Sequence, residues 1–417
     1  MEVKPGYKQT EVGVIPDDWE VYPVMQMGDV LTGKALAVNA PGQARPYLRT
    51  KNVFDGRIVV DDVLTMPMTD EQFANFRLRN GDVLLNEGQS LDLVGRCSVY
   101  SDEYPEPCAM QNQLLRFRAR AGVSGVFASH LFRRCQQAGV FAKVALQTTS
   151  IAHLGGSRFE RLRLAWPKDE CEQNAIAAAL SDVDALHGGL ERLVAKKRNL
   201  KQAAMQQLLT GQSRLPGFNG EWEEKRLGDC LLSQPDYGIN AAAVAFSDKL
   251  PTYIRITDIS EHGRFCPDPR VSVKAASADQ FYLHEGDVVF ARTGASVGKS
   301  YVYDSRDGEL VFAGFLIRVR PNSELLVPAF LAAYASTKPY WNWVRLMSMR
   351  SGQPGINGNE YAQLPLLLPT LPEQTAIAKV LSDMDAELAA LEQCRDKSRD
   401  LKQGMMQELL TGRTRLV

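Results

Sequence analysis

The chain has 417 residues, of which 45% are hydrophobic and 23% charged, and its formal net charge at pH 7 is -1. This length predicts more than one domain, and the near-neutral charge gives no sign of a polyanion partner, although a sum can conceal local basic surfaces. The N-terminus starts no apolar signal segment and no run of about 18 apolar residues occurs, so we expect a cytoplasmic protein without membrane contact. The 7 cysteines form no C-x-x-C pair. We therefore expect reduced thiols rather than zinc or disulfides.

The first stretch, residues 1–165, consists of short β-type runs separated by turn residues, which predicts a β-rich globular domain. One turn in it carries two glycines and a basic residue, running from Asn86-Glu87-Gly88-Gln89-Ser90 to Gly95-Arg96. Such a turn exposes backbone N–H groups, small hydroxyls and a cation, which suits contact with phosphate.

Residues 166–215 predict a long helix, because no proline occurs from Glu172 to Leu209 and apolar residues fall near a/d spacing. We expect Ser181-Asp182 to cap and restart the helix after a short first segment, and Thr210-Gly211 to end it. A helix of about 28 residues would span roughly 42 Å, a little more than one turn of B-DNA. Such a helix could act as a spacer of fixed length or could only hold the domains together, and the residues leave both roles open.

Residues 216–368 form a second β-rich stretch that is weakly related to the first. Tyr47-Leu48-Arg49 matches Tyr253-Ile254-Arg255, and Gly81-Asp82-Val83 matches Gly286-Asp287-Val288. The scaffold therefore looks duplicated, whereas the surfaces have diverged. Two similar helical segments beside two divergent globular halves predict that each half recognises a different target.

The loop Arg292-Thr293-Gly294-Ala295-Ser296-Val297-Gly298-Lys299-Ser300 contains a G-x-S-x-G match and comes close to a phosphate-binding loop. Its glycine spacing is one residue short of the phosphate-binding pattern, and a β-type run follows where either motif needs a helix. We therefore expect no catalysis here, but a second Gly-flanked turn that suits phosphate contact.

Residues 369–417 repeat the central helical segment. Glu172-Gln173 returns as Glu373-Gln374, Leu208-Leu209-Thr210-Gly211 returns as Leu409-Leu410-Thr411-Gly412, and more than half of the aligned positions are identical. We again expect a cap at Ser382-Asp383. Lys197 and its equivalent Ser398 break the apolar seam, which would fix one register. The residues predicted to form the seam and dock a partner are Val183, Leu186, Leu190, Leu193, Leu200, Met384, Leu388, Leu391, Leu401 and Met405.

Arginine, glutamine and asparagine read base edges, whereas lysine and serine mostly hold phosphate, and these types gather around the two turns and the two Tyr-x-Arg runs. The predicted DNA-contacting residues are Arg49, Lys51, Gln89, Ser90 and Arg96 in the first half, and Arg255, Thr257, Arg292, Thr293, Ser296, Lys299, Arg350 and Gln353 in the second. Each of them could equally be a solvated surface residue.

The whole chain resembles a specificity subunit of a type I restriction–modification system. The resemblance rests on the L-K-Q-x-x-M-Q-x-L-L-T-G helix endings, the opening Leu371-Pro372-Glu373-Gln374, the loop 291–299 and the N-terminal run 6–16. In one respect the first loop departs from the family pattern, because Glu87 stands where the second loop has Arg292. The contacts of that loop cannot be copied from one half to the other.

The resemblance implies an α+β (mixed α/β) protein with two target-recognition domains, 1–165 and 216–368, separated by two long antiparallel coiled-coil helices, 166–215 and 369–417, in a pseudo-two-fold repeat. Each domain would read one half of a split, asymmetric double-stranded DNA target. The helices would set the gap and dock two methyltransferase subunits, which restriction subunits then join. S-adenosylmethionine, ATP and Mg would bind those partners, and this chain would be non-catalytic. No adenine-methylation tetrapeptide, Rossmann fingerprint or complete Walker loop occurs in it.

Two other classes of function remain open on the residues alone. One is a coiled-coil scaffold that holds enzymes without touching DNA, and the other is an enzyme. A specificity component of a related fused or non-ATP-dependent modification system is compatible with the same sequence. Salt-dependent DNA affinity would exclude the scaffold. An enzyme would depend on the Ser296 loop, and replacement of Ser296 would then abolish turnover.

Overall fold

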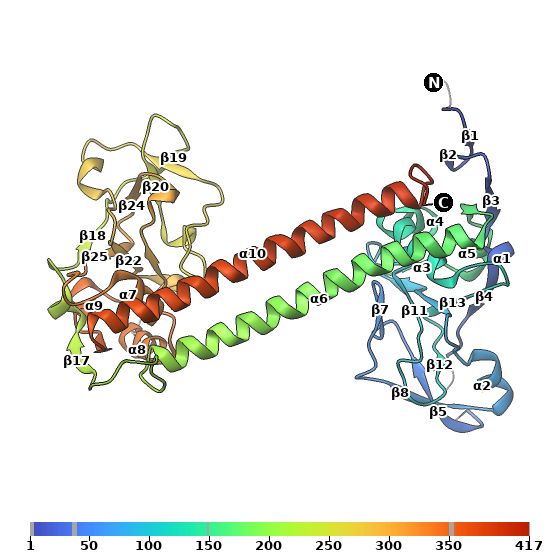
Figure 1. Ribbon diagram of the computed structural model, residues 1–417, viewed down its shortest axis with the longest axis horizontal. Helices are drawn as coiled ribbons and strands as arrows, with labels where there is room; N and C mark the ends of the chain where they lie inside the picture. The colour runs from blue at the N-terminus through green and yellow to red at the C-terminus, as the bar shows by residue number, and fades with distance from the viewer. Residues whose placement is uncertain (1–3, 36–39, 148–149, 350–353, 417) are drawn as a thin grey trace. The chain divides into compact units, whose positions relative to one another are not determined.

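The computed structural model describes residues 4–35, 40–147, 150–349 and 354–416. The chain divides into two units: unit 1 contains residues 1–191 and 394–417, and unit 2 contains residues 192–393. Each unit therefore holds one β-rich body and parts of both long helices, α6 (Glu170–Leu208) and α10 (Leu371–Leu409) (Figure 1). The fold is mixed α+β, as the sequence predicted. Among the described residues, no helix is long and apolar enough to cross a membrane.

Unit 1 is built on a four-stranded antiparallel sheet in the order β11-β9-β13-β4 and a three-stranded sheet in the order β12-β5-β8, in which β12 and β5 are parallel. The strands of these sheets are β4 (Gly28–Thr32), β5 (Gln43–Leu48), β8 (Leu64–Met68), β9 (Val83–Asn86), β11 (Cys97–Val99), β12 (Ala109–Met110) and β13 (Leu114–Ala119). The smaller sheets use β1 (Tyr7–Thr10), β2 (Gly13–Pro16), β3 (Trp19–Pro23), β6 (Val53–Phe54), β7 (Arg57–Ile58), β10 (Gly88–Gln89), β14 (Leu146–Gln147), β15 (Ala152–His153) and β16 (Arg163–Pro167). The shorter helices are α1 (Val24–Met27), α2 (Asp70–Phe76), α3 (Gly125–Gln137), α4 (Val140–Val144) and α5 (Gly156–Arg161).

Unit 2 repeats the four-stranded sheet of this topology and has one more strand in its second sheet. Its four-stranded sheet has the order β18-β25-β22-β23, and its second sheet, β19-β21-β20-β24, again contains one parallel pair, β20 with β24. The strands are β17 (Glu223–Arg226), β18 (Asp236–Tyr237), β19 (Ala243–Ala245), β20 (Thr252–Ile254), β21 (Val271–Val273), β22 (Val288–Ala291), β23 (Ser300–Val302), β24 (Leu310–Phe312), β25 (Leu316–Val319) and β26 (Pro365–Leu368). Its helices are α7 (Pro328–Tyr334), α8 (Lys338–Ser348) and α9 (Gly358–Ala362), with 3-10 turns η1 (Leu227–Cys230), η2 (Ile256–Asp258), η3 (Ala278–Phe281), η4 (Gly294–Ser296) and η5 (Ser305–Asp307).

The core of each unit is closed by the two long helices. In unit 1, Ile176 and Leu180 of α6 join Met406 and Leu409 of α10 in one buried cluster with Trp166. In unit 2, Ile377 and Leu381 of α10 take the same place beside Leu208 and Leu209, which lie at the end of α6. Burial of these apolar side chains stabilises each helix against its own β-rich body.

The repeated Glu-Gln pair anchors the start of each long helix. Glu172 and Gln173 are each 1% exposed. Glu172 accepts a hydrogen bond from Trp19 Nε1 (3.1 Å) and one from Arg415 Nη2 (2.9 Å). Gln173 accepts from the Ser124 N–H (2.9 Å) and donates to the Pro167 carbonyl (3.0 Å). A buried carboxylate without a cation would be costly, so the arginine stabilises it.

The same anchor occurs in unit 2. Arg214 donates to both carboxylate oxygens of Glu373, at 2.5 and 2.6 Å. Gln374 accepts from the Val327 N–H (2.9 Å) and donates to the Pro369 carbonyl (3.0 Å). The Glu-Gln repeat in the sequence is therefore a pair of structural joints rather than a site for a ligand.

Each long helix is continuous, and the predicted restart after a short first segment was wrong. Ser181 and Ser382 lie inside α6 and α10. The Ser181 hydroxyl does not cap a helix but lies 3.1 Å from His130 Nε2, and Asp383 pairs with Lys379 one turn earlier (2.8 Å). Serine and aspartate are compatible with a helix interior when other residues, near or far in the sequence, satisfy their side chains. The predicted stops are confirmed, since Gly211 and Gly412 adopt φ values of 71° and 70°.

The buried contacts between the helices differ from the predicted seam. Leu186, Leu193, Leu200 and Leu401 are 53%, 39%, 48% and 54% exposed. Val183, Leu190, Met384, Leu391 and Met405 are partly buried. Of the ten predicted positions only Leu388 is buried. Val194, which the prediction left out, and Ser398, the predicted polar break, are buried as well. A leucine at heptad spacing can lie on either face of a helix, and neighbouring segments decide which face is covered.

Equivalent ion pairs connect the helices within each unit. In unit 1, Lys402 Nζ lies 2.6 Å from Asp184, and in unit 2 the equivalent Lys201 Nζ lies 2.6 Å from Asp385. The polar residues that interrupt the apolar seam have different partners in the two helices. Ser398 of α10 bonds His187 at 2.8 Å, whereas Lys197 of α6 pairs with Glu387 at 2.6 Å. Within each unit the paired segments run antiparallel.

Candidate nucleic-acid interface

The turn in unit 2 that was predicted to contact DNA is a tightly held hairpin between β22 and β23. The Gly298 N–H donates to the Ala291 carbonyl (3.0 Å), and the buried Tyr340 hydroxyl donates to the Gly298 carbonyl (2.6 Å). Gly298 has φ 90°, and a Cβ there would lie 2.8 Å from Val344 Cγ1. Only glycine fits this position. The strand that follows the turn confirms the expectation that it feeds no helix.

The equivalent turn in unit 1 uses the same device. Gly95 has φ 78°, and a Cβ there would lie 2.1 Å from Phe141 Cδ2. The Gly95 N–H donates to the Asn86 carbonyl (2.8 Å). Both turns are therefore held in place by contacts with their own unit, so their side chains have defined positions.

The charged residues of the two turns have different partners. In unit 1, Glu87 bonds His153 Nδ1 (3.0 Å), and Arg96 lies over the Phe54 ring with its Cζ 4.8 Å from the centroid. In unit 2, Lys299 forms an ion pair with Glu261 (2.6 Å). Arg292, at the position of Glu87, lies over the Tyr237 ring, also at 4.8 Å.

The two arginines of the Tyr-x-Arg runs form ion pairs within their own units. Arg49 pairs with Asp62, and Arg255 forms two hydrogen bonds with Asp258, at 2.7 and 2.9 Å. Asp258 also accepts from the Arg255 N–H (2.8 Å), as Asn52 does from the Arg49 N–H (3.0 Å). These contacts fix the chain after β5 and β20, so a stabilising role accounts for both arginines without DNA.

In each unit a cavity lies beside the Tyr-x-Arg run. The first, of about 350 Å³, brings together the predicted residues Lys51, Gln89 and Arg96. The second, of about 310 Å³, brings together Arg255 and Thr257. The remaining predicted residues that the structure describes do not line these cavities. Ser90 is exposed in its turn, and Arg292, Thr293, Ser296 and Lys299 are partly buried in theirs. Arg350 and Gln353 lie outside the described residues.

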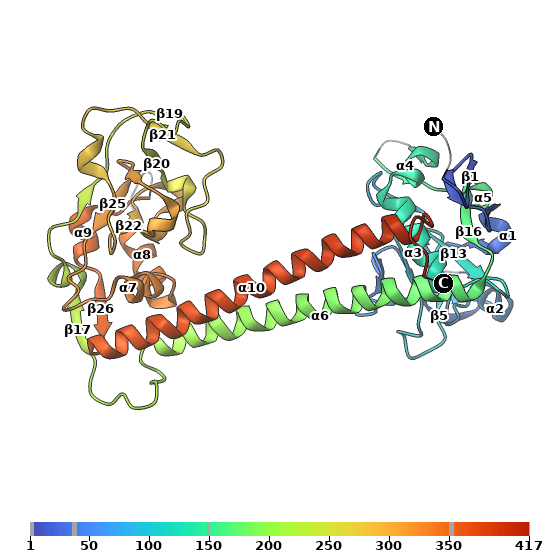
Figure 2. The same ribbon diagram turned by 45° about the horizontal axis from the view of Figure 1, so that its top comes forward.

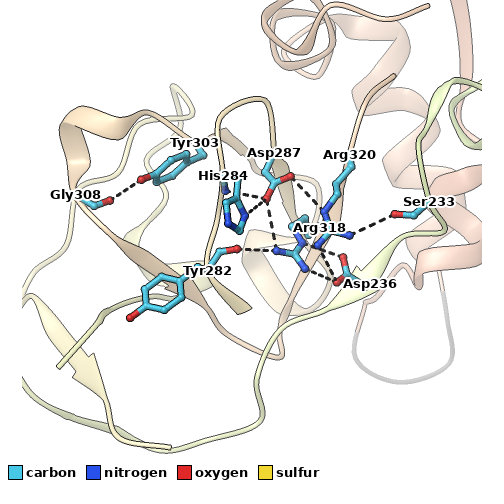
Figure 3. A network of polar contacts seen from close by, with 9 residues as sticks. All are labelled: Ser233, Asp236, Tyr282, His284, Asp287, Tyr303, Gly308, Arg318 and Arg320. Carbon is cyan, nitrogen blue, oxygen red and sulfur yellow. Dashed lines mark hydrogen bonds and ion pairs between the residues drawn. The ribbon is translucent and has the colours of Figure 1, made fainter. Parts of the chain in front are cut away.

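A network of ion pairs connects the strands of the four-stranded sheet in unit 2, and sequence reasoning missed it. Arg318, on β25, is 2% exposed at its side chain, and its Nη2 lies 2.6 Å from Asp236 Oδ2. Asp287, at the start of β22, lies 3.5 Å from Arg318 Nη1 and 3.6 Å from Arg320 Nε (Figure 3). Burial raises the pKa of the Asp287 carboxyl, although the His284 N–H and both arginines oppose that shift.

Unit 1 has the same arrangement. Arg116 lies 2.9 Å from Asp29, and Arg118 lies 2.7 Å from Asp82. The signal in the sequence is an Arg-x-Arg pair on equivalent strands, Arg116-Phe117-Arg118 and Arg318-Val319-Arg320. Residues i and i+2 of a strand lie on one face, so both arginines reach the aspartates of neighbouring strands.

Together these observations define a class of protein. It has two topologically equivalent β-rich units with divergent polar turns, each closed by a pair of repeated helices.

Comparisons with known proteins identify the family to which this class of protein corresponds. The family model described as "Type I restriction modification DNA specificity domain" matches residues 219–398. The type I restriction enzyme MjaVIII specificity subunit of Methanocaldococcus jannaschii is 21% identical over 96% of this chain and 94% of its own length. The StySPI specificity subunit of Salmonella potsdam is 20% identical over 91% and 85%.

Solved structures agree in fold. The S subunit of a type I restriction–modification system from M. genitalium matches with a TM-score of 0.57 at 15% identity, covering 98% of both chains. A chain from a study of complex assembly and conformational transition of the type I R-M system also matches with a TM-score of 0.57, at 18% identity over 95% and 99%.

The chain belongs to the specificity subunits of type I restriction–modification systems. It is the DNA specificity subunit of such a system and is non-catalytic. It acts in a complex with other subunits on a DNA target, and S-adenosylmethionine and ATP are bound by the methyltransferase and restriction subunits.

Proposed function

We propose that each β-rich unit reads one half of a split, asymmetric double-stranded DNA target, and that the long helices set the gap between the halves. The observation that carries the proposal is the repeated sheet order with diverged turns. The four-stranded sheets have equivalent strand orders and each second sheet contains one parallel pair, whereas at equivalent turn positions Glu87 replaces Arg292 and Arg96 replaces Lys299. Selection for two different base sequences explains why scaffolds stay alike while their polar turns differ.

The proposal divides the chain into two recognition domains, 1–165 and 216–368, and two helical spacers, 166–215 and 369–417. The spacers dock two methyltransferase subunits, which restriction subunits with bound Mg then join in the cytoplasm. The exposed leucines support docking, because Leu186, Leu193 and Leu200 recur at heptad spacing on α6. Such an apolar stripe is unfavourable in water and favourable under a partner helix.

The test is single-molecule sequencing of N6-methyladenine in the source genome with and without this gene. Loss of methylation at one gapped, two-part motif would support the proposal and identify the target. If methylation is unchanged while the neighbouring methyltransferase is expressed, the chain does not direct methylation and the proposal fails.

A further inference from the structure

The two recognition turns hold a stacked guanidinium group at opposite ends. In unit 2 it comes from Arg292, the first charged position of the turn, whereas Lys299 at the last position is paired with Glu261. In unit 1 it comes from Arg96 at the last position, whereas Glu87 at the first is paired with His153. In each turn, one charged residue is paired with a residue of opposite or complementary polarity in the same unit. The other, an arginine, is stacked on an aromatic ring.

Arg96 has the geometry of a preorganised donor. Its Cζ lies 4.8 Å from the Phe54 ring centroid, and Arg57 lies 5.2 Å from the same ring. Within the described part of the chain, the Arg96 side chain has no hydrogen-bond or ion-pair partner, and its Nε is buried and unsatisfied. Stacking fixes the plane of the guanidinium group, so that its edge donors point in set directions with little loss of side-chain entropy on binding.

The surroundings of Arg96 suit a base edge better than a phosphate. Arg96 lines the cavity of about 350 Å³ together with Gln89, Lys51, Asp61 and Asp62. A phosphate offers only acceptors and would leave the carboxylates of this lining without donors, whereas base-pair edges offer both donors and acceptors. Asp62 is already paired with Arg49, which lowers the negative charge that a base would meet.

Arg292 has a similar environment in unit 2. It stacks on Tyr237, which is 41% exposed and lies on the edge strand β18. The only hydrogen bond of its side chain within the described part of the chain is a long one from Nη1 to the Gly314 carbonyl (3.5 Å). The Tyr237 hydroxyl accepts from the Gly358 N–H (3.0 Å), which holds the ring under the guanidinium group.

We propose that Arg96 and Arg292 are the guanine-reading residues of the two recognition units, each donating two hydrogen bonds to guanine O6 and N7 in the major groove. A guanidinium group with a fixed plane is the side chain whose donor spacing matches these two acceptors. The inference rests on the proposed function and adds a requirement to it. Each half of the target contains at least one G·C pair.

The experiment uses the assembled methyltransferase complex with Arg96→Lys and, separately, Arg292→Lys. Lysine keeps the charge but cannot form the planar pair of donors. Methylation sequencing should show that R96K relaxes one guanine position in one half of the motif, with discrimination reduced between roughly fivefold and 150-fold. R292K should do the same in the other half, and the gap should be unchanged in both.

A modified DNA duplex tests which guanine atoms the arginine contacts. Replacement of the guanine by 7-deazaguanine removes the N7 acceptor and should weaken binding of the wild-type complex, whereas R96K should bind both duplexes alike. Arg57→Lys and Arg270→Lys serve as controls. Arg57 shares the Phe54 ring but does not line the cavity, and Arg270 stacks on Phe246 but already bonds Thr252 Oγ1 (3.0 Å). Complexes that carry either control substitution should still methylate the full motif.

Three results would overturn the inference: a half-site without guanine, an unchanged motif in an assembled R96K or R292K complex, or equal weakening at every position. The last would identify a phosphate contact. If the wild-type complex methylates no gapped motif at all, the proposed function fails as well, so the two failures can be told apart.

Discussion

Arg415 connects the end of the chain to the start of α6. It pairs with Glu172, which is buried, and with Asp18 at 2.7 Å. These hydrogen bonds raise the pKa of the Arg415 guanidinium group, and the one from Arg415 lowers the pKa of Asp18. Arg415→Ala should destabilise unit 1 by about 1–3 kcal/mol, less than for a fully buried pair because the Arg415 side chain is 28% exposed.

Hydrogen–deuterium exchange on the assembled complex measures this effect. Protection should fall at the start of α6 and at β3, while unit 2 keeps its own Arg214–Glu373 anchor and serves as an internal control. Adding Glu172→Gln should recover part of the loss, because no charge is then left buried without a partner. Equal losses in the two units would contradict the local role of Arg415.

His130 makes unit 1 sensitive to acid. Burial lowers its pKa to about 4, and the neighbouring Arg133 acts in the same direction, whereas Asp184 opposes it. The folded state therefore binds fewer protons than the unfolded state between about pH 4 and 6.5, so this contribution to stability is complete above pH 6.5 and is lost as the pH falls.

Between pH 6.5 and 5.5 this residue should cost unit 1 about 1 kcal/mol. Hydrogen exchange of α3, corrected for its intrinsic pH dependence, should show the loss, and His130→Gln should remove most of it. The same pH slope in wild type and variant would mean that another group titrates.

The long helices show how much of an element sequence can predict. Their existence, their repeat and their glycine stops followed from local pattern, because these depend on residues close in the chain. The buried face did not, because Leu186 and Leu200 carry the same heptad signal as Leu388, and only their neighbours in space distinguish them. For the same reason the sequence located the two glycine-flanked turns but could not show that Arg49 and Arg255 are held by aspartates.

The exposed stripe on α6 gives a prediction about assembly. Leu186→Gln, Leu193→Gln and Leu200→Gln together should abolish co-purification with the methyltransferase subunit, because the apolar area available to a partner helix is removed. Arg192→Gln with Asn199→Gln, on another face of the same helix, is the matched control. Without its partner the wild-type chain should be poorly soluble, and the triple variant should be more soluble. Retained binding by a folded triple variant would place the docking surface elsewhere.

At the scale of the whole molecule, the gap in the DNA target should follow the length of the two helices. The same number of residues separates Asp184 from Lys201 in α6 and Asp385 from Lys402 in α10. Deleting seven residues between these positions in both helices keeps the partners of both ion pairs opposite each other. It also nearly preserves which side of each helix faces the other helix. Each helix then shortens by about 10.5 Å, which corresponds to about 3 base pairs of B-DNA.

Methylation sequencing should therefore find the same two half-sites with a gap shorter by about 3 base pairs. Deleting the seven residues from α6 alone is the control. It takes Asp184 and Lys201 out of step with Lys402 and Asp385, so that both ion pairs cannot form together, and it should impair assembly instead of giving a new gap. If the double deletion left the gap unchanged and altered the bases, the helices would not act as spacers. A shorter gap with the same bases would assign spacing to the helices and base choice to the units that they join.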